Sequence, residues 1–468
     1  MRSLLAVRKF RAPHTYVLLF LIMVSVAILS YVIPAGEFVR EIDEATGRTL
    51  AVPGTFHVTE RSPITPFGLF MAIPKGMEKA GYIIFLVLLV GGTFGILEAT
   101  GTVNAGVGSL VKKTKGKEKL LIVASMLLFS LGGAIFGMAE EMLLFIPVYI
   151  AVSLAVGFDT ITGIAICWVG ASSGFAAAFL NPFTVGIAQG ISGLPPFSGM
   201  GYRILAYSII VLISIIYVYR HASKIQKNPK LSLTYELDQE NRETFHLGEM
   251  KELTNRHKII LFTLLIGVGV IAYGVIKLGF YITELSAIFV ILGVVAGVIG
   301  GMKADQIAKE FINGAKQMTY GALVIGLATS ISVILQEGQI LDTIVNGLSQ
   351  IVIGLPPAVS AVAMFITQSF LNVLIPSGSG QAAASMPIMA PLADLVGLTR
   401  QTAVLAFQFG DGFSNTITPT HGVLMAAIAM GGVSWTKWAR WMLPLFLTWS
   451  VVGAILVVGS YLINYGPF

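Results

Sequence analysis

The sequence predicts an all-α polytopic membrane protein, and three features of its 468 residues support this fold class. Hydrophobic residues make up 55% of the chain and charged residues only 12%, which is about half the charged fraction of soluble domains. The mean hydropathy is +0.82. Several apolar runs, for example 15–34 and 441–463, reach the roughly 20 residues that a membrane-spanning helix requires. We therefore expect many transmembrane helices.

The basic residues predict how these helices are oriented. They gather near the N-terminus, at 112–119 and at 220–230, whereas 36–63 is acidic and rich in turn residues. Because Lys and Arg concentrate in cytoplasmic loops, we expect a multi-pass protein of the bacterial plasma (inner) membrane with a cytoplasmic N-terminus. These loops explain the net charge of +6, so we expect membrane lipid and no nucleic acid as a partner. The first apolar run is too long for the apolar region of a signal peptide, about 7–15 residues, and we interpret it as a retained helix.

A hydrophilic cytoplasmic linker, 220–258, separates two similar transmembrane halves, 1–219 and 259–468. Residues of the same type recur 238 (314 − 76) or 240 (410 − 170) positions apart, as in the pairs Gly76/Gly314, Tyr82/Tyr320, Pro147/Pro387 and Gly170/Gly410. Basic residues follow the last helix of the first half but precede the last helix of the second half. The halves are therefore expected to have opposite orientations, and such an inverted repeat is typical of secondary transporters.

Two polar interruptions break the apolar pattern of the second half. Within a membrane an interrupted helix must line a cavity or be buried in protein, because its freed backbone groups find no water. The stretch 375–385 (IPSGSGQAAAS) predicts a re-entrant hairpin whose tip exposes Ser377, Ser379 and Gln381. The stretch 410–422 (GDGFSNTITPTHG) predicts a broken helix that carries Asp411, Ser414, Asn415, Thr416, Thr418, Thr420 and His421.

The first half has an interruption at each corresponding place. The stretch 136–145 (FGMAEEMLLF) predicts a second hairpin, and the 240-residue separation places Glu141 opposite Gln381. The stretch 170–186 predicts a second broken helix, in which Asn181-Pro182-Phe183-Thr184 corresponds to Thr418-Pro419-Thr420. Two re-entrant hairpins and two broken helices are therefore expected.

These interruptions contain the side chains that a transport site requires. Hydroxyl, amide and carboxylate oxygens beside unwound carbonyls suit a partly dehydrated cation such as Na⁺, and half-helix N-termini suit a carboxylate. We expect the substrate to bind at Glu140, Glu141, Asn181, Thr184, Ser377, Ser379, Gln381, Asn415, Thr416 and Thr420. We expect ion coupling at Asp411, Ser414, Asn415, Thr418, Ser172, Ser173 and His421, with a Na⁺ site at Asp411, Ser414 and Asn415. The alternative is that small polar residues only let helices pack closely.

The acidic residues at membrane depth are functional-site hypotheses by default. One of the adjacent pair Glu140 and Glu141 has an alternative role as the cap of the following helix. His421 either carries protons or only forms a hydrogen bond beside a turn. No Lys or Arg lies within the four interruptions, which favours a cationic or zwitterionic substrate, or cation coupling. We expect no enzymatic activity, because the His, Cys and Asp residues lack metal-ligand spacing and no H-E-x-x-H motif is present.

At these same residues the chain resembles a known group of carriers. The segments PSGSG and MAPL, together with SNTITPT, resemble the ion transporter superfamily, in which the SNT triplet holds Na⁺ and a substrate carboxylate. The segments IPAGEF, GMAEE, AAAFLNPFTVGIAQGISGLPPFSGMGYR and GDGFSNTITPTHG resemble the YfcC-type branch over essentially the whole chain. That branch is grouped with C4-dicarboxylate anaerobic carriers and is similar to arginine/ornithine antiporters.

The resemblance implies a homodimer in which each protomer has a scaffold domain and a transport domain that moves as an elevator. One departure is that the first half lacks an SNT triplet, so Glu140 or Glu141 would take over its charge role. The leading hypothesis is a secondary active transporter that exchanges amino acids of the arginine/ornithine type. The alternative within this class is a Na⁺- or H⁺-coupled transporter of C4-dicarboxylates or other small carboxylates. A channel and a membrane-embedded enzyme are the competing classes, and no cofactor other than the coupling Na⁺ or H⁺ is expected.

Overall fold

A computed structural model describes residues 15–43, 48–103, 105–106, 108–109, 117–244, 253–278, 280 and 282–466. The described part is mainly helical, which confirms the predicted fold class of a helical polytopic membrane protein. Eight of its helices are long and apolar enough to cross a membrane. They are α1 (Thr15–Val32), α3 (Gly81–Ala99), α5 (Glu118–Phe136), α9 (Met200–Lys227), α12 (Ile282–Ile299), α14 (Thr319–Glu337), α16 (Pro357–Leu374) and α20 (Trp435–Leu462).

The remaining helices connect or interrupt these spans. Their bounds are α2 (Pro66–Lys79), α6 (Ile146–Ala155), α7 (Thr160–Ala176), α8 (Ile187–Ile191), α10 (Tyr235–Thr244), α11 (Asn255–Tyr273), α13 (Ala304–Gln317), α15 (Leu341–Val352), α17 (Gly378–Leu395), α18 (Arg400–Ser414) and α19 (Gly422–Met430). Short 3₁₀ segments cover Glu140–Phe145 and Pro229–Leu231, and short π segments cover Pro182–Gly186 and Gly274–Leu278.

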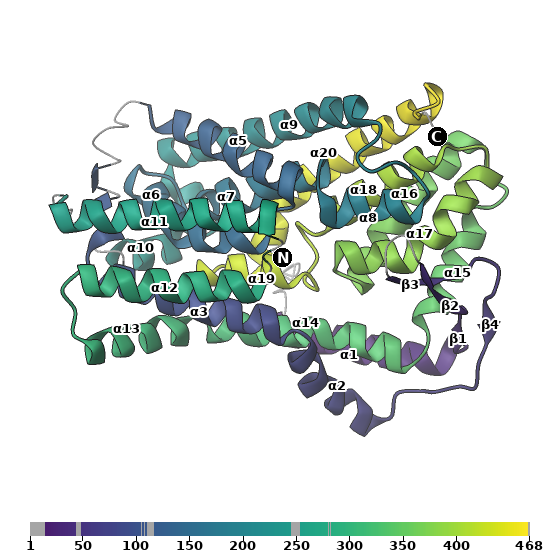
Figure 1. Cartoon of the computed structure of the whole chain (residues 1–468), viewed down its shortest axis with the longest axis horizontal. Helices are drawn as coiled ribbons and strands as arrows, with labels where there is room; N and C mark the ends of the chain where they lie inside the picture. Colours follow the sequence, from purple (N-terminus) through teal and green to yellow (C-terminus); the bar gives the residue numbers. More distant parts are fainter. Residues whose placement is uncertain are drawn as a thin grey trace, which may run out of the picture.

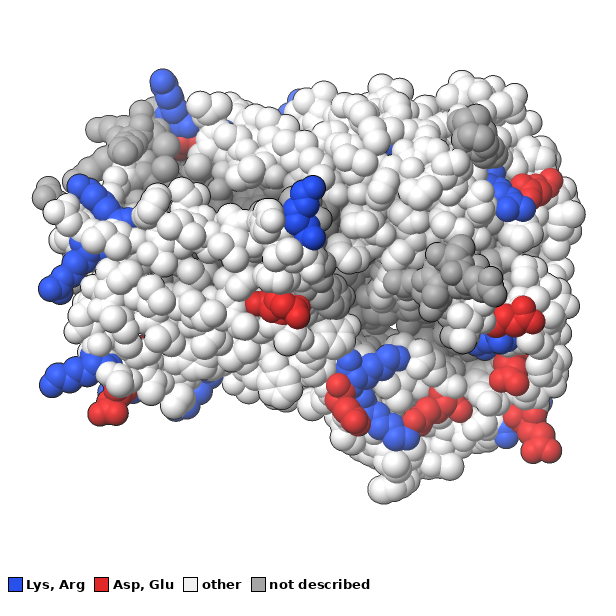
Figure 2. All heavy atoms as spheres, viewed as in Figure 1, with Lys and Arg blue, Asp and Glu red and all other residues white. Residues whose placement is uncertain are grey.

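Most helices run along the long axis of the molecule (Figure 1). Helices α5, α6, α7, α11, α12 and α13 gather toward one end, and α15, α16, α17 and α18 lie toward the other. On the face in Figure 2, Lys and Arg dominate the first of these ends, whereas acidic and basic side chains are mixed toward the other end. Basic residues at one end are what the positive-inside rule associates with the cytoplasmic side.

Three pairs of helices at corresponding places in the two halves of the sequence have equal lengths. Helices α2 and α13 have 14 residues each, α3 and α14 have 19 each, and α9 and α20 have 28 each. Helix α2 packs on α14, and α13 packs on α3. A methyl group at Gly76 would lie 2.7 Å from the Gly326 carbonyl oxygen, and one at Gly314 would lie 2.9 Å from Gly95 Cα. The two glycines that recur in the sequence therefore occupy equivalent helix crossings.

The segment between α1 and α2 departs from an all-helical description. It forms two small antiparallel sheets, one from β1 (Gly36–Glu37) and β4 (His57–Val58), the other from β2 (Arg40–Asp43) and β3 (Arg48–Ala51). The turn-rich composition did not predict these strands. Strands this short need few apolar residues to pair, so they leave little signal in the sequence. Asp342 of α15 accepts hydrogen bonds from Arg40 and from the Phe38 backbone N–H, which fastens the sheets to the second half.

The described part of the linker contains regular secondary structure. Helix α9 continues to Lys227, so the helical part of the first half ends eight residues later than the expected boundary at 219 (227 − 219). Helix α10 lies within the linker and packs against α6 and α7.

Candidate substrate and ion site

The hairpin of the second half is built from α16 and α17, which pack side by side. Residues 375–377 interrupt the helix, and the Ser377 hydroxyl caps α17 by accepting a hydrogen bond from the Gly380 N–H. Gln381 Nε2 donates to the carbonyl oxygen and to Oε1 of Gln368 at 2.8 and 2.7 Å. Ser385 Oγ donates to the same Gln368 Oε1. This polar contact fastens the two arms of the hairpin, so Gln381 serves the frame of the site.

The broken helix of the second half is unwound later than the sequence predicts. Asp411 and Ser414 still belong to α18, because the hydrogen bond from the Asn415 N–H to the Asp411 carbonyl continues the helix. The unwound stretch is 415–421. Trp435 Nε1 and Trp438 Nε1 donate to the freed carbonyl oxygens of Ile417 and Thr416 at 2.8 and 2.9 Å. These indole groups supply partners that the backbone would otherwise lack in a membrane.

Asn372 of α16 organises this second interruption. Its Nδ2 lies 3.1 Å from the Asp411 carbonyl oxygen, 2.8 Å from Ser414 Oγ and 2.7 Å from Asn415 Oδ1. Asn415 Nδ2 in turn donates to Asp411 Oδ1. The side chains of Ser414 and Asn415 are therefore engaged by protein groups, whereas the buried Asp411 Oδ2 has no hydrogen-bond partner in the described residues. Asp411 is thus the member of the expected Na⁺ set whose oxygen is free to accept a cation.

The hairpin of the first half ends α5 at Phe136 and turns at Gly137, whose φ of 71° suits glycine. The 3₁₀ segment that carries Glu140 and Glu141 follows directly. Glu141 Oε2 accepts a hydrogen bond from the Ala139 N–H at 3.0 Å. Neither member of the pair caps the following helix as expected, because no side-chain cap hydrogen bond is found at the start of the 3₁₀ segment or of α6. Glu141 instead holds the preceding turn, while Glu140 makes no such side-chain bond in the described residues.

The broken helix of the first half differs from the prediction in one respect. Ser172 and Ser173 lie inside α7, and Ser173 Oγ donates to the Gly170 carbonyl, so neither serine stands at the interruption. The interruption is 177–181, and Asn181 caps the following π segment through the Phe183 N–H. Asn181 Nδ2 and Thr184 Oγ1 are buried without partners in the described residues. Residues 170–174 (GASSG) have the spacing of a serine nucleophile motif, but that motif requires a strand-to-helix turn, which α7 does not provide.

The tips of the four interruptions meet around a central cavity of about 520 Å³. This volume is typical of small-molecule sites. A methyl group at Gly378 would lie 2.6 Å from Thr184 Cγ2 and 3.0 Å from Asp411 Oδ2, so the two halves touch at this point. Seven of the expected site residues line the cavity, namely Glu140, Glu141, Thr184, Ser377, Ser379, Asn415 and His421.

The other expected residues lie behind or beside this lining. Thr420 lines an adjoining hollow of about 370 Å³, which shares Tyr82, Ile83 and Ser377 with the central cavity. The remaining residues are buried and do not line either space; they are Ser172, Ser173, Asn181, Gln381, Asp411, Ser414, Thr416 and Thr418. The aromatic lining formed by Tyr82, Phe175, Phe183 and Phe280 was not predicted from the sequence, and neither were the roles of Asn372 and Gln368. Amide side chains inside the apolar run 357–374 are the signal that would have found the last two.

The lining of the cavity combines groups of opposite electrostatic character. Glu140 and Glu141 of the first half contribute carboxylates to it. The first residues of α17 and α19, Gly378 and Gly422, also line it, and helix N-termini carry unsatisfied N–H groups and a partial positive charge. No Lys or Arg is found among the described residues that line the cavity. Carboxylates and helix N-termini are therefore found in the lining of one cavity.

The His421 side chain caps one of the two helices whose N-termini line the cavity. Its Nδ1 accepts a hydrogen bond from the Leu424 N–H at 3.2 Å, so it caps α19. A neutral His421 consequently carries its proton on Nε2 and is a hydrogen-bond donor. Its ring lies 5.5 Å from the Trp168 ring, which fixes its orientation. The geometry favours ligand binding over proton carriage for this residue.

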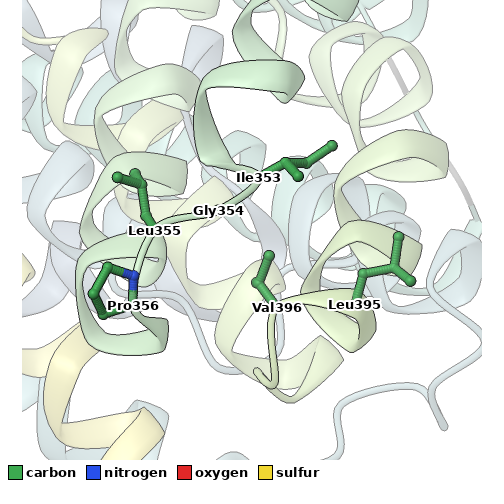
Figure 3. Close-up of a pocket in the computed structure, with 6 residues that line it drawn as sticks. All are labelled: Ile353, Gly354, Leu355, Pro356, Leu395 and Val396. Atoms are coloured by element: carbon green, nitrogen blue, oxygen red, sulfur yellow. The ribbon is translucent and has the colours of Figure 1, made fainter.

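A larger hollow of about 620 Å³ lies between the 353–356 turn and the end of α17 (Figure 3). It is lined by Ile353, Gly354, Leu355, Pro356, Leu395 and Val396. These residues offer no charged or hydrogen-bonding side chain, so we do not assign the substrate to this hollow.

The membrane-spanning helices together with the buried polar site define a multi-pass membrane protein. Residues 12–462 match the family described as "DcuC: C4-dicarboxylate anaerobic carrier". The chain belongs to this family and is a membrane transporter of that type.

Two relatives match nearly the whole chain. The Escherichia coli (strain K12) protein named "Putative basic amino acid antiporter YfcC" is 34% identical over 495 residues, and the match covers 98% of both chains. An uncharacterized protein of Haemophilus influenzae (strain ATCC 51907 / DSM 11121 / KW20 / Rd) is 29% identical over 504 residues, covering 97% of both. The solved YdaH transporter of Alcanivorax borkumensis is similar with a TM-score of 0.42 and 16% identity, over 97% of this chain and 100% of that chain.

Proposed function

We propose that this protein is a secondary active antiporter that exchanges amino acids with basic side chains, such as arginine and ornithine. The single observation that carries the proposal is that carboxylates and helix N-termini line the same cavity. Glu140 and Glu141 line it together with the first residues of α17 and α19. A basic amino acid has a cationic side chain for the carboxylates and a carboxylate for the helix N-termini. The name of the Escherichia coli relative agrees with this substrate class.

Each group has a defined task in this proposal. The carboxylate of the substrate accepts hydrogen bonds from the backbone N–H groups of Gly378 and Ser379 and from Nε2 of His421. The cationic group pairs with Glu140, whose side chain is not engaged in capping, while Glu141 holds the turn. Thr184 Oγ1, which is buried without a partner in the described residues, supplies a further hydrogen bond at the contact between the halves.

The coupling ion is proposed to bind at Asp411. Its free Oδ2 lies beside Gly378, where a methyl group would come within 3.0 Å of it. Burial of an unpaired carboxylate is costly, so Asp411 would bind either H⁺ or Na⁺ when the cavity is occupied. Asn415 positions this carboxylate by donating to Oδ1, and Asn372 engages both Asn415 and Ser414, which makes them less available as direct ligands.

An elevator motion of a homodimer is proposed as the mechanism. Helices α1, α2, α3, α12, α13 and α14 pack chiefly on one another and would form the scaffold. Helices α5, α6, α7, α9 and α16, α17, α18, α20 form a second packed group and would move with the substrate. The equal lengths of equivalent helices support an inverted repeat, and the basic end of the molecule supports a cytoplasmic N-terminus.

A second candidate function is Na⁺- or H⁺-coupled transport of a C4-dicarboxylate. Two helix N-termini at one cavity are suited to carboxylates, and the family carries the name of such carriers. In this case Glu140 and Glu141 would have to be protonated, because an anion is repelled by two ionised carboxylates.

Counterflow in proteoliposomes distinguishes the two candidates. Liposomes loaded with ornithine should take up labelled arginine, and Glu140→Gln should abolish the exchange. Glu41→Gln, which removes an exposed carboxylate on β2, is the matched control and should exchange normally. Uptake of labelled succinate driven by a Na⁺ or H⁺ gradient, without arginine exchange, would instead establish the second candidate. Exchange that persists in Glu140→Gln would overturn the assigned role of the cavity acids.

A further inference from the structure

A basic pocket of about 370 Å³ lies at the end of α9, away from the central cavity. It is lined by Tyr219, Arg220, Ser223, Lys224 and Lys227. Because residues three and four apart share a helix face, these five side chains form one surface on the last two turns of a membrane-spanning helix. Lys119, from the first turn of α5, adds a fourth cation, with its Nζ 5.5 Å from the centre of the Tyr219 ring.

The cations of this pocket have no anionic partner in the described part of the chain. None of the ion pairs found there includes Arg220, Lys224 or Lys227, and their side chains make no hydrogen bonds with described residues. Ser223 Oγ is also buried without a hydrogen-bond partner there. Three unneutralised cations around an unused hydroxyl have the chemistry of a site for a phosphate group, which accepts several charge-assisted hydrogen bonds.

An exposed apolar stripe runs along α9 directly into the pocket. Leu212, Ile216 and Tyr219 are 58%, 40% and 37% exposed, and the spacing 212, 216, 219, 223 keeps them on one helix face. The neighbouring helix α5 packs against α9 and exposes Leu120 and Leu128 at 61% and 67%. The basic pocket therefore stands at the end of a surface suited to acyl chains.

We propose that this pocket binds the phosphodiester headgroup of an anionic phospholipid, with an acyl chain lying along the exposed stripe of α9. Basic pockets between transmembrane helices at the membrane surface are suited to such headgroups. A free phosphate ion has the same charge chemistry, but it would make no use of the apolar stripe that adjoins the pocket. The stripe is the reason to assign a lipid.

Native mass spectrometry of the full chain in a neutral detergent, titrated with phosphatidylglycerol or phosphatidylcholine, tests the proposal. The variant Arg220→Gln/Lys224→Gln/Lys227→Gln should bind phosphatidylglycerol roughly 100-fold more weakly and phosphatidylcholine as before. The matched control Lys303→Gln/Lys309→Gln/Lys316→Gln removes three exposed cations from α13 and should bind both lipids like the wild type.

Equal weakening in the two triple variants would show that only net charge matters and would overturn the site. Full competition by millimolar inorganic phosphate would assign the pocket to free phosphate and would overturn the lipid assignment. Should the first triple variant fail to fold, Ser223→Leu fills the pocket without a change of charge, and it should weaken phosphatidylglycerol binding at least tenfold. Unchanged binding in Ser223→Leu would also contradict the proposal.

Discussion

Equivalent helix pairs of the two halves share close glycine contacts, but only the second half adds a polar cross-link to them. In the first half α5 packs on α7 through glycine, since a methyl group at Gly133 or Gly174 would overlap the backbone of the facing helix. In the second half α16 packs on α18 through Gly410, whose methyl group would lie 2.8 Å from the Ser369 backbone N, and Asn372 adds three polar contacts. Small residues and interhelical hydrogen bonds are the two usual means of helix association in membranes.

The two halves also differ in how the side chains at the tips of their interruptions are held. In the described residues, side chains at the first-half tips bond to near neighbours in sequence, as Glu141 does with Ala139 and Asn181 with Phe183. The second-half tips are cross-linked between helices by Asn372 and by Gln368. We infer that the second half provides the rigid frame of the site, and that the first half provides the charge and the freedom to adjust to the ligand.

Asn372→Leu tests the cross-link and should have the largest effect. It leaves Asn415 Oδ1 without its donor in a buried place, and each such loss costs about 1–3 kcal/mol. We expect thermal unfolding in detergent at a clearly lower temperature and complete loss of transport. Asn372→Asp keeps the shape but not the donor, and should behave similarly. A fully stable Asn372→Leu protein would show that the polar contacts do not hold the frame.

Gly174→Ala tests the glycine contact of the first half. The new methyl group would meet the Ser130 backbone, which cannot move aside as a flexible side chain would. Overpacking of this kind typically costs about 1–3 kcal/mol. Gly201→Ala is the matched control, because nothing lies within 4 Å of its methyl position. Thermal unfolding of both variants should show a loss for Gly174→Ala alone, and equal midpoints would contradict close packing.

Gly378→Ala tests the contact between the halves. Its methyl group would lie 2.6 Å from Thr184 Cγ2, so transport should fall while the stability changes by less than about 1.5 kcal/mol. Thr184→Ser removes that methyl group and keeps the hydroxyl, so the double variant Gly378→Ala/Thr184→Ser should recover transport. If the second substitution gives no recovery, the two halves do not meet at this point during transport.

Much of this arrangement is predictable from sequence because its signals are local. Apolar length predicts the spans, and Gly, Pro and polar residues within them predict the interruptions near Gly137, Asn181, Pro376 and Asn415. Contacts between distant segments left weaker signals. Asn372 resembles any polar residue near a helix end, and the aromatic lining of the cavity resembles lipid-facing residues. The persistence of α18 through Asp411 depends on a partner helix that the sequence does not reveal.

The two halves also differ at the residues that cap α7 and α18, Asp159 and Thr399, which stand 240 positions apart (399 − 159). Asp159 caps α7, and His221 and Ser232, from after the start of the linker, bond to it. Thr399 caps α18 and donates to the Tyr465 carbonyl beyond α20. Each inner helix is thus fastened at its start by the end of its half. In the first half a carboxylate is itself the cap and is bonded by His221, whereas in the second half the cap is a hydroxyl and the neighbouring Arg400 pairs with Asp394.

Asp238 of α10 adds a second carboxylate to the first of these caps, and its removal should have the smallest effect. Burial and the charge of Asp159 raise the pKa of Asp238, so the protonated group stabilises the folded protein at acidic pH. That contribution is lost as the pH rises from about 4, the pKa of an unfolded aspartate, through the raised pKa. The variant Asp238→Asn cannot make this pH-dependent contribution. Its amide oxygen can still accept the hydrogen bond that the Thr160 N–H donates to Asp238 Oδ1 in the wild type.

Thermal unfolding of the wild type and Asp238→Asn between pH 4 and 7 measures this contribution. The stability of the wild type relative to the variant should decrease as the pH rises, by no more than about 1 kcal/mol. Glu236→Gln, at an exposed position of the same helix, should give a difference that does not vary with pH. If the stability difference between the wild type and Asp238→Asn is also constant with pH, the carboxylates of Asp159 and Asp238 do not repel each other. The charged groups at the start of α7 would then give no more pH dependence than the Thr399 cap of α18.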